Sequence, residues 1–538
     1  MVSLSDWKRR RGITGGVYRV DRCFPALRKA LDARGWTSND DEGESYLWDL
    51  RYAIKFSGVG DMEKISESQV YNFFLRNREF AAKSYLNDNL LSCNVTSADW
   101  QLDRDAFYPR SFDLSRSSEH FADYFKWVKC LSILKALQKY LSSHPSIDSV
   151  LISPEGIAAA VQGGRAYTKD ADSVLEGHGE VNDKFPCHLW AVLEKIDTNT
   201  WTIKKKSPPI NENASFTQND LRPTTWVAVS PSSPVTGVAD TRTSLMTEID
   251  EVLKLWKARD TQFELTTFSN PLWVVKPSGK SRGRGVRVLT DLCEILSFSG
   301  INVVQKYIEN PLLINGRKFD IRQWGLVTEW SPLGLWFYEK CYLRFAVNQY
   351  DARNRSKYIH LTNNSISKKN VNFDSEQSMM NCGDFSDLLR RNFQVDISQI
   401  KKQLKALTYT CLACCQETVT ARKNSFEMVG LDFMIDTNFH VWLLEANCSP
   451  DLSYSTPTTS DLVQKMLPDL VKVLLDVEGF CGSRSERKWG PKLLKNIYSG
   501  DFTLLRPVNR RKETLLNKNR EILKIDGVAL RTRTTIKS

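Results

Sequence analysis

The sequence predicts an α/β fold, with the densest succession of strands and helices between about residues 273 and 480. Two observations lead to this prediction. Short apolar and β-branched runs, which are typical of buried strands, alternate with segments of helical periodicity. Charged or amide residues interrupt some of these runs two positions apart, and that spacing places them on one face of a strand. The 538-residue chain is long enough for roughly two to four domains.

Composition and charge narrow the class of protein. Hydrophobic residues make up 41% and charged residues 25% of the chain, which is typical of a globular protein in water. The opening MVSLSDWKRRRG has no apolar segment of a secretory signal, and no apolar run reaches the roughly 20 residues of a membrane span. The formal net charge of +11 favours an acidic partner: nucleic acid, anionic lipid or an acidic protein surface.

The twelve cysteines show no paired framework and are expected to be reduced cytosolic thiols. Cys411, Cys414 and Cys415 form the one cluster, in a segment of helical periodicity. A zinc site needs further Cys or His ligands at suitable spacing, and none is nearby. We therefore expect these three side chains to pack inside the protein.

The first third of the chain mixes short strands and helices. Residues 16–39 predict a strand followed by an amphipathic helix that stops at Gly35, and residues 117–141 predict a long helix. Between residues 145 and 240 the pattern weakens into polar, Pro- and Ser-containing stretches that are typical of loops or an insertion. Residues 506–538 carry ten Lys or Arg against three acids and are expected to form a poorly ordered basic tail.

The segment WVVKPSGKSRGRGVRVL, residues 273–289, begins with a strand that ends at Lys276. Three glycines follow, which let backbone N–H groups approach a phosphate, and Lys280, Arg282 and Arg284 add positive charge. The loop is not a Walker A loop, because the GK[ST] ending is missing. Taken alone, it fits either a phosphate-binding loop or a solvated hairpin.

The next two motifs are also strands. In INVVQKYIENP, residues 301–311, the strand end can offer backbone groups to an adenine edge, or it can be an ordinary edge strand. In GRKFDIRQWGLV, residues 316–327, a period of two points Lys318, Asp320 and Arg322 to one face. That face is either solvated or lines a cleft.

The segment EMVGLDFMIDTNFHVWLLEANCSP, residues 427–450, predicts a hairpin of two apolar strands. Asp432 interrupts the first strand, and Glu445 and Asn447 interrupt the second on one face. Lone carboxylates are costly to bury, whereas Mg²⁺ prefers carboxylate and amide oxygens with phosphates in its remaining positions. The hairpin therefore predicts a metal site rather than isolated buried charges.

One histidine lies near polar residues that can bind an anion. His360, in YIHLTNNS, has no acidic partner in the sequence and is expected to orient a loop through hydrogen bonds. Thr362 and Asn363 beside it can donate to a phosphate or coordinate a metal. No Ser-His-Asp or Cys-His arrangement is visible in the sequence.

Taken in order, these motifs resemble the tubulin tyrosine ligase-like family, a branch of the ATP-grasp ligases. The resemblance covers roughly residues 271–456 and includes YLRFA and HLTNNSI; upstream, FPALRKALDARGW and FYPRSFDLS are also similar. It implies an ATP-grasp ligase fold, with a nucleotide cleft between a central and a C-terminal domain and a smaller N-terminal α/β domain. The implied divisions are 1–115, 116–310 with the insertion 145–240, 311–480, and the basic tail 481–538.

The resemblance also implies a role for each matching residue. Arg322 and Arg344 are expected to face the reacting carboxylates. Asp432, Glu445 and Asn447 are expected to hold two Mg²⁺ ions. The residues expected to bind ATP are Lys276, Arg282, Gly283, Arg284, Gly285, Gln305, Lys306, Tyr307, Ile308, Lys318, Asp320, Thr362 and Asn363.

The implied activity is ligation of an amino acid to a glutamate γ-carboxylate in an acidic tubulin tail, through an acylphosphate. The loop KSRGRG and the segment ALDARGW are similar to the glycine-adding subgroup, so free glycine is the expected donor. The alternatives are a tubulin polyglutamylase, a non-catalytic microtubule-binding protein and, least favoured, a nucleic-acid-binding protein. We expect a monomer on cytoplasmic microtubules, in the axoneme of a cilium or flagellum, that binds neither nucleic acid nor membrane.

Overall fold

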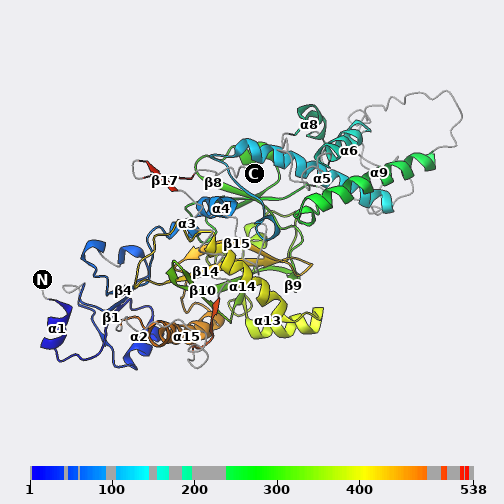
Figure 1. The fold of residues 1–538 in the computed structure, drawn as a ribbon. Helices are drawn as coiled ribbons and strands as arrows, with labels where there is room; N and C mark the ends of the chain where they lie inside the picture. Colours follow the sequence, from blue (N-terminus) through cyan, green and yellow to red (C-terminus); the bar gives the residue numbers. More distant parts are fainter. Residues whose placement is uncertain are drawn as a thin grey trace. The chain divides into compact units, whose positions relative to one another are not determined.

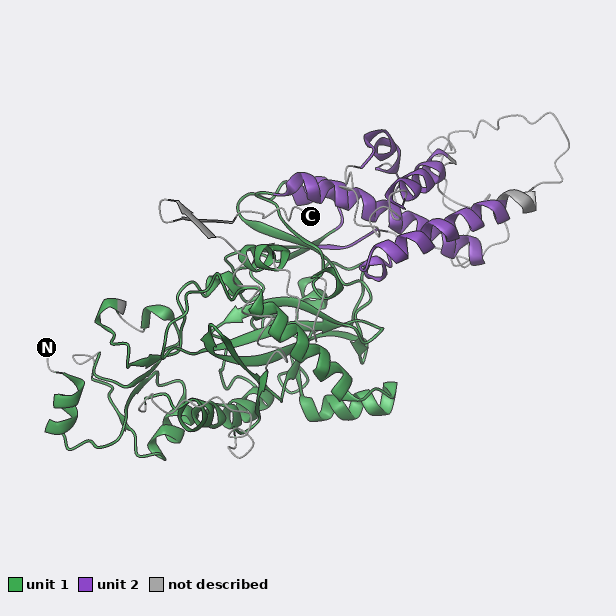
Figure 2. Cartoon of the chain, in the orientation of Figure 1, with its two compact units in different colours: residues 1–116, 274–289, 297–538 green, residues 117–273, 290–296 purple. Residues whose placement is uncertain are grey.

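The computed structural model gives a mixed α/β fold for the described part of the chain (Figure 1). The structure describes residues 3–41, 46–58, 61–92, 104–143, 154–168, 185–194, 196, 238–268, 270–481, 499–505, 522–525 and 528–531. The chain divides into two compact units, shown in green and purple in Figure 2. Unit 1 contains residues 1–116, 274–289 and 297–538, and unit 2 contains residues 117–273 and 290–296.

Unit 1 begins with helix α1 (Leu4–Arg10) and a parallel sheet in the strand order β2-β1-β3-β4. Its strands are β1 (Val17–Val20), β2 (Thr37–Ser38), β3 (Leu50–Tyr52) and β4 (Val70–Tyr71). Helix α2 (Pro25–Asp32) connects β1 to β2, and Gly35 follows it with a positive φ of 74°. The predicted strand, helix and glycine stop are confirmed. Helices α3 (Arg78–Ala81) and α4 (Lys83–Ser92) come next in the chain.

A second sheet has the order β5-β8-β6-β7. Its strands are β5 (Ser111–Asp113), β6 (Trp273–Pro277), β7 (Arg287–Leu289) and β8 (Asn302–Lys306). Strand β8 pairs with β5 as well as β6, so the alternative of an edge strand at residues 301–311 is wrong.

The largest sheet of unit 1 is built around the long strand β10 (Arg317–Trp330). Antiparallel to β10 run β9 (Leu313–Ile314), β11 (Leu333–Tyr338), β12 (Tyr342–Phe345) and β14 (Glu427–Ile435). Strands β13 (Met379–Asn381), β15 (Val441–Cys448) and β16 (Phe502–Leu505) extend the sheet. The predicted hairpin of residues 427–450 is confirmed as β14 and β15.

Helices pack around this sheet and complete the core of unit 1. They are α11 (Lys357–His360), α12 (Asn364–Ser367), α13 (Cys382–Leu388), α14 (Ile397–Ala413) and α15 (Pro457–Val471). Cys411, Cys414 and Cys415 are at most 7% exposed and belong to the largest apolar cluster. Their predicted role in packing is confirmed.

Unit 2 is a helical assembly of α5 (Ser118–Ser143), α6 (Pro154–Thr168), α8 (Cys187–Leu193), α9 (Val238–Arg259) and α10 (Leu292–Leu296). Helix α5 confirms the predicted long helix. A Cβ atom on Gly164 would lie 2.5 Å from Val252 Cγ1 and 2.8 Å from Leu134 Cδ1, so this glycine lets α6 approach α9 and α5 closely. Tyr167 stacks on Trp256 with ring centroids 4.2 Å apart.

Several predictions for the less regular regions fall on residues outside the description. The Pro- and Ser-containing stretches of the predicted insertion lie outside the described residues, as does most of the basic tail. Within the tail, β17 (Ile522–Ile525) and β18 (Val528–Arg531) form an antiparallel hairpin, and the poor order expected of the tail stays a prediction. The division into three domains and a tail stays a prediction. Among the helices described, none has the length and apolarity to cross a membrane.

Candidate active site

A cavity of about 100 Å³ lies between the four-stranded sheet β5-β8-β6-β7 and the eight-stranded sheet around β10. Most of the predicted ATP and metal residues line it: Lys276, Gly283, Gln305, Lys306, Tyr307, Ile308, Lys318, Asp320, Thr362, Asn363, Asp432 and Glu445. Because Lys318 and Asp320 are only 5% and 4% exposed in this lining, their strand face borders a cleft. The alternative of a solvated sheet face is wrong.

Lys276 is the penultimate residue of strand β6 and is held by the neighbouring strand β8. Its Nζ donates a hydrogen bond to Gln305 Oε1 at 2.7 Å, and Gln305 Nε2 in turn donates to Ser111 Oγ at 2.9 Å. Burial lowers the pKa of Lys276 to about 8, although the nearby Glu445 carboxylate opposes this shift. Lys276 is therefore a positioned cation that has lost much of its hydration, and an anion in the cavity would stabilise its charge.

Lys318 is a second desolvated cation in the same cavity. Its Nζ donates to Tyr307 Oη at 2.8 Å and to the His360 carbonyl oxygen at 3.0 Å. Burial lowers the pKa of Lys318 to about 7. Two lysines with lowered pKa values in one cavity fit a polyanion such as the phosphates of a nucleotide.

His360 holds this arrangement through both ring nitrogens. Its Nε2 lies 2.8 Å from the Asn354 carbonyl oxygen, so Nε2 carries the proton and donates. Nδ1 therefore accepts a hydrogen bond from Tyr307 Oη, at 2.8 Å. Burial lowers the pKa of His360 to about 4, which keeps the ring neutral. The prediction that His360 orients a loop is confirmed.

Lys306, which is also among the residues expected to bind ATP, forms a buried ion pair at the end of β8. Its Nζ donates to Glu309 Oε1 at 2.5 Å and to the Tyr307 carbonyl oxygen at 3.1 Å. Both members of this ion pair are at most 1% exposed at their side chains. The pair fixes the turn that follows β8 and so shapes the cavity wall.

Two aspartates and two arginines form a buried, charge-balanced cluster. Arg344 Nε donates to Asp320 Oδ1 at 2.8 Å, and its Nη2 lies 2.9 Å from Asp432 Oδ2. Arg322 Nε donates to Asp432 Oδ1 at 2.5 Å. Burial acts to raise the pKa of Asp432, but the Arg322 and Arg344 charges and hydrogen bonds hold it well below its usual range.

The predicted metal ligands meet where β14 pairs with β15. Asp432 is opposite Glu445 in the ladder, and Asn447 Nδ2 lies 3.4 Å from Glu445 Oε1. In the described part of the chain, no three His, Cys, Asp or Glu side chains form a complete cage. Mg²⁺ is commonly held by one or two carboxylates together with phosphate oxygens, so this donor set fits a metal that is shared with a bound nucleotide.

The glycine loop between β6 and β7 closes one side of the cavity. Gly283 has φ +70°, and an added Cβ would lie 2.6 Å from Asn363 Oδ1, so the close approach requires glycine. Lys280 lines the cavity but is exposed. At about 100 Å³ the cavity is smaller than the roughly 300–1,000 Å³ that is typical of small-molecule pockets.

A second, larger cavity of about 490 Å³ opens beside the first and also lies within unit 1. Four further residues predicted from the sequence line it: Arg282, Arg322, Arg344 and Asn447. Asn363 and Glu445 line both cavities, so the two are adjacent. Arg284 and Gly285 of the glycine loop line neither cavity.

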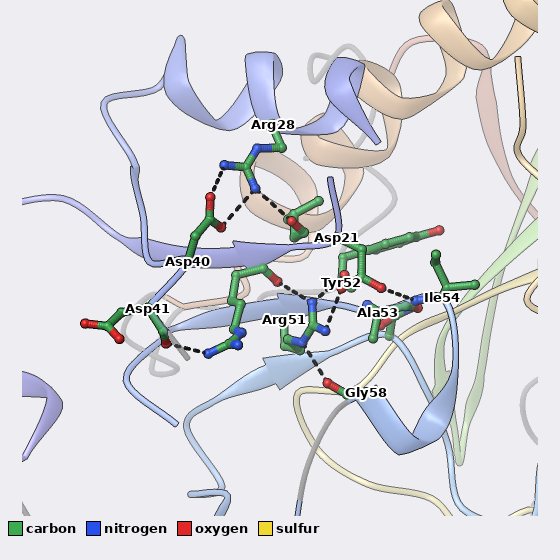
Figure 3. A network of polar contacts seen from close by, with 12 residues as sticks. Asp21, Arg28, Asp40, Asp41, Arg51, Tyr52, Ala53, Ile54 and Gly58 are labelled. Atoms are coloured by element: carbon green, nitrogen blue, oxygen red, sulfur yellow. Dashed lines mark hydrogen bonds and ion pairs between the residues drawn. The ribbon is translucent and has the colours of Figure 1, made fainter. Parts of the chain in front are cut away.

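The N-terminal sheet supplies one wall of the larger cavity, including Tyr52, Ala53 and Ile54. A polar network holds this wall (Figure 3). Arg51 Nη2 donates to Asp21 Oδ1 at 2.6 Å and Arg51 Nε donates to the Gly58 carbonyl oxygen at 3.0 Å. The other carboxylate oxygen of Asp21 accepts from the Ile54 N–H at 2.9 Å. These contacts fix the chain direction at the end of β3.

One cavity residue, Lys83 at the start of α4, was not predicted from the sequence. Its Nζ lies 3.4 Å from Glu445 Oε2 and donates to the Lys280 carbonyl oxygen at 3.1 Å. The next residue, Ser84, hydrogen-bonds Ser278 Oγ through its own hydroxyl at 2.7 Å. Helix α4 therefore anchors the glycine loop and adds a further lysine to the cavity. Nothing in the local sequence distinguishes this lysine from a surface one.

Comparison with known proteins gives consistent matches. A model of the tubulin-tyrosine ligase family matches residues 185–481, which is more than half of the chain. Tubulin monoglycylase TTLL3 of Danio rerio is 37% identical over 562 residues, covering 91% of this chain and 68% of the relative. Tubulin glycylase 3D of Tetrahymena thermophila is 31% identical over 526 residues, covering 88% of this chain and 50% of the relative.

A third relative, the protein monoglycylase TTLL8 of Mus musculus, is 29% identical over 481 residues, which cover 85% of this chain and 54% of the relative. The chain thus spans about half the length of several curated relatives that it matches.

Proposed function

The chain belongs to the tubulin-tyrosine ligase family and has its ATP-grasp type of α/β fold, and on this premise we propose that it is an ATP- and magnesium-dependent tubulin–glycine ligase. The proposed reaction joins the amine of free glycine to a glutamate γ-carboxylate in an acidic C-terminal tail of tubulin. The support for glycine is that the relatives described above are named as glycylases or monoglycylases.

One observation carries the proposal for the nucleotide. Lys276 and Lys318, both desolvated, face the same cavity as the paired carboxylates Asp432 and Glu445. Cations positioned for phosphates and oxygen ligands positioned for Mg²⁺ are the two requirements of phosphoryl transfer. When bound, ATP would supply the phosphoryl group that activates an acceptor carboxylate, and Mg²⁺ would neutralise the charge of the phosphates.

The chain's own residues position the substrates and neutralise their charge. Lys276 and Lys318 bind phosphate oxygens, and Gln305 and Tyr307 hold the two lysines in place through the hydrogen bonds described above. Asp432, Glu445 and Asn447 are the residues that would hold the metal. The glycine loop covers the cavity and excludes water, which otherwise competes with the amine.

The larger cavity provides room for the acceptor. Arg322 and Arg344 reach its lining from β10 and β12, and their guanidinium groups can attract a substrate carboxylate. Because both are also bonded to Asp432, the acceptor and metal regions share one charge network. We propose that this network sets the acceptor carboxylate beside the phosphates.

The experiment that tests the proposal offers labelled glycine and labelled glutamate in separate reactions. Each contains the purified chain, ATP, Mg²⁺ and microtubules, and matched reactions omit ATP. We expect ATP-dependent label in tubulin from glycine alone. Label from glutamate alone would instead make the protein a polyglutamylase, and microtubule binding without incorporation of either would make it a non-catalytic binding protein.

A further inference from the structure

Cys341 and Cys382 flank the end of the β12–β13 ladder. The antiparallel register pairs Arg344 with Met379, Leu343 with Met380 and Tyr342 with Asn381. The recorded pairing ends there. Cys341 directly precedes β12, and Cys382 directly follows β13 and begins helix α13, so the register continued by one residue would set the two cysteines opposite each other. Opposite residues of an antiparallel pair have Cα atoms roughly 4.5–5.5 Å apart. A disulfide spans Cα atoms about 4.4–6.8 Å apart, so the separation suits a crosslink.

The surroundings of the pair make the two sulfurs chemically different. Cys341 is 2% exposed, whereas Cys382 is only partly buried, and both are free thiols. The Cys341 thiol donates a hydrogen bond to the Cys382 sulfur, which lowers the pKa of Cys382 despite its burial and raises the pKa of Cys341. Lys401 acts in the same direction on Cys382, and Glu339 opposes it.

The other buried cysteines differ from this pair. Burial raises the pKa of Cys411 to about 12. Cys415 lies four residues later, just beyond the end of α14, and its thiol donates a hydrogen bond to the Cys411 carbonyl oxygen. Buried thiols without a group that stabilises the thiolate react slowly with oxidants. Cys411 and Cys415 provide internal controls within the same chain.

We propose that Cys341 and Cys382 are a redox-active dithiol, which a peroxide converts reversibly into an intrachain disulfide. The Cys382 thiolate attacks one oxygen of hydrogen peroxide, the O–O bond breaks, and the departing hydroxide is protonated to water. The Cys341 sulfur then attacks the Cys382 sulfenic acid, the S–O bond breaks, and a second water leaves with the Cys341 proton. Two thiols lose two electrons and two protons, and the peroxide is reduced to two waters.

The proposed disulfide would join two strands that carry residues of the site. Strand β12 carries Arg344, which is bonded to Asp320 and Asp432, and β13 carries Met379, which lines the larger cavity. A disulfide would tie these two strands together at one end of the cavity region. Its formation does not depend on the proposed ligase activity, so the test needs no substrate.

Peptide mapping tests the proposal on the full unmodified chain. The protein is treated with hydrogen peroxide, remaining thiols are alkylated, and the chain is cut with trypsin. Cys341 is the one cysteine of the tryptic peptide 341–344 and Cys382 is the one cysteine of 370–390. We expect these two peptides to be joined with the loss of two hydrogen atoms and to separate on treatment with dithiothreitol, while Cys411, Cys414 and Cys415 stay reduced.

Two variants identify the order of the steps. Cys341→Ser is expected to leave a sulfenic acid on Cys382 that dimedone labels, and Cys382→Ser is expected to give neither the crosslink nor the label. The proposal is overturned if peptide 370–390 is oxidised to sulfinic acid in the wild-type chain while 341–344 stays reduced. It is also overturned if both peptides stay reduced while the exposed Cys23 or Cys293 is oxidised.

Discussion

Arg322 and Asp432 are directly opposite each other on strands β10 and β14, and Arg322 Nε lies 2.5 Å from Asp432 Oδ1. Asp432 also faces Glu445 on its other side, across the β14–β15 ladder. The two predicted metal-binding carboxylates therefore differ in kind. Asp432 is 2% exposed and held by two arginines, whereas Glu445 is partly exposed and has long contacts to Lys83 and Asn447.

This difference predicts that Glu445 and Asp432 variants separate catalysis from stability. Glu445→Gln should lower the Mg²⁺-dependent rate by roughly 100-fold or more, because it removes a metal-binding charge, with little change in unfolding temperature. Asp432→Asn should also lower the free energy of unfolding by about 3–5 kcal/mol, because it leaves two buried arginines short of their partner. Reaction rates measured at several Mg²⁺ concentrations report the effect on catalysis, and thermal unfolding reports the effect on stability. Asp461→Asn, at an exposed ion pair with Lys465 outside both cavities, is the control. Wild-type activity in Glu445→Gln would remove Glu445 from the metal site.

Lys318 predicts that nucleotide binding takes up a proton. Its pKa is lowered to about 7 in the free protein, and phosphates in the cavity would raise it. Above about pH 7 the free lysine is increasingly neutral, so nucleotide affinity should fall as the pH rises towards about 9. Calorimetry at about pH 8 in two buffers of different ionisation enthalpy measures the uptake.

The matched variant for this prediction is Lys318→Arg, whose side chain stays charged. It should reduce the proton uptake, leaving the part that Lys276 contributes through its pKa of about 8. Equal proton uptake in the two proteins would show that Lys318 does not change protonation on binding.

Glu427 predicts a pH-dependent stability that is separate from the cavity. The side chain is fully buried at the start of β14, and it accepts hydrogen bonds from Asn77 Nδ2 at 2.7 Å and Phe74 N–H at 3.3 Å. Burial raises its pKa from 4.5 to about 8, so the folded protein holds a proton that the unfolded chain releases. Stability should therefore fall as the pH rises through this window, by up to about 1.4 kcal/mol per pH unit.

Glu427→Gln removes this titration while keeping a similar shape. The variant should gain stability relative to the wild type as the pH is raised from about 5 to about 7.5, as thermal unfolding at the two values would show. A constant difference between the two proteins at both pH values would contradict a raised pKa.

The net charge of +11 predicts that binding to an acidic tail depends strongly on salt. Exposed charges are screened within about 10 Å at 0.1 M salt, so the dissociation constant of a tubulin-tail peptide should rise roughly 10-fold between low and physiological ionic strength. Fluorescence anisotropy of a labelled peptide measures it. A peptide with glutamine in place of its glutamates should bind weakly at both ionic strengths. If the dissociation constant of the acidic peptide does not change with salt, electrostatic steering is excluded.

Local patterns predicted the strands and which faces their charged residues share, but not the partners of those residues. Lys318, Asp320 and Arg322 could be placed on one face because a strand has a period of two. That Arg322 pairs with Asp432 depends on the register of β10 against β14, which are more than a hundred residues apart. A change of one position in that register would send every side chain to the other face, and no local pattern fixes it.

The alternative that stayed open for β8 and the failure to predict Lys83 have the same physical origin. Strand β8 was compatible with an edge position because its sequence carries no sign of β5, which pairs with it from almost 200 residues upstream. Lys83 was missed because its place in the cavity depends on the contact of Ser84 with Ser278 in the glycine loop. Long-range pairing decides both, whereas hydrophobic periodicity reports only local structure.

Two glycines of the loop provide the last prediction, because they differ in what a methyl group would meet. At Gly283 the φ of +70° is strained for any other residue, and a Cβ atom would lie 2.5 Å from Ile366 Cδ1. At Gly279 the backbone is ordinary and no atom lies within 4 Å of an added Cβ. Gly283→Ala should therefore disfavour this loop conformation by about 1–3 kcal/mol and raise the dissociation constant of ATP about 10-fold.

Gly279→Ala is the matched control and should change ATP affinity less than about twofold, since the substitution adds one methyl group to open space. Calorimetric titration with ATP measures both variants, and thermal unfolding checks that each is folded. If the two substitutions weaken binding equally, the close contact between Gly283 and Asn363 does not position the loop over the phosphates. If Gly283→Ala alone weakens it, the left-handed glycine is what holds the loop against Asn363 at the edge of the cavity.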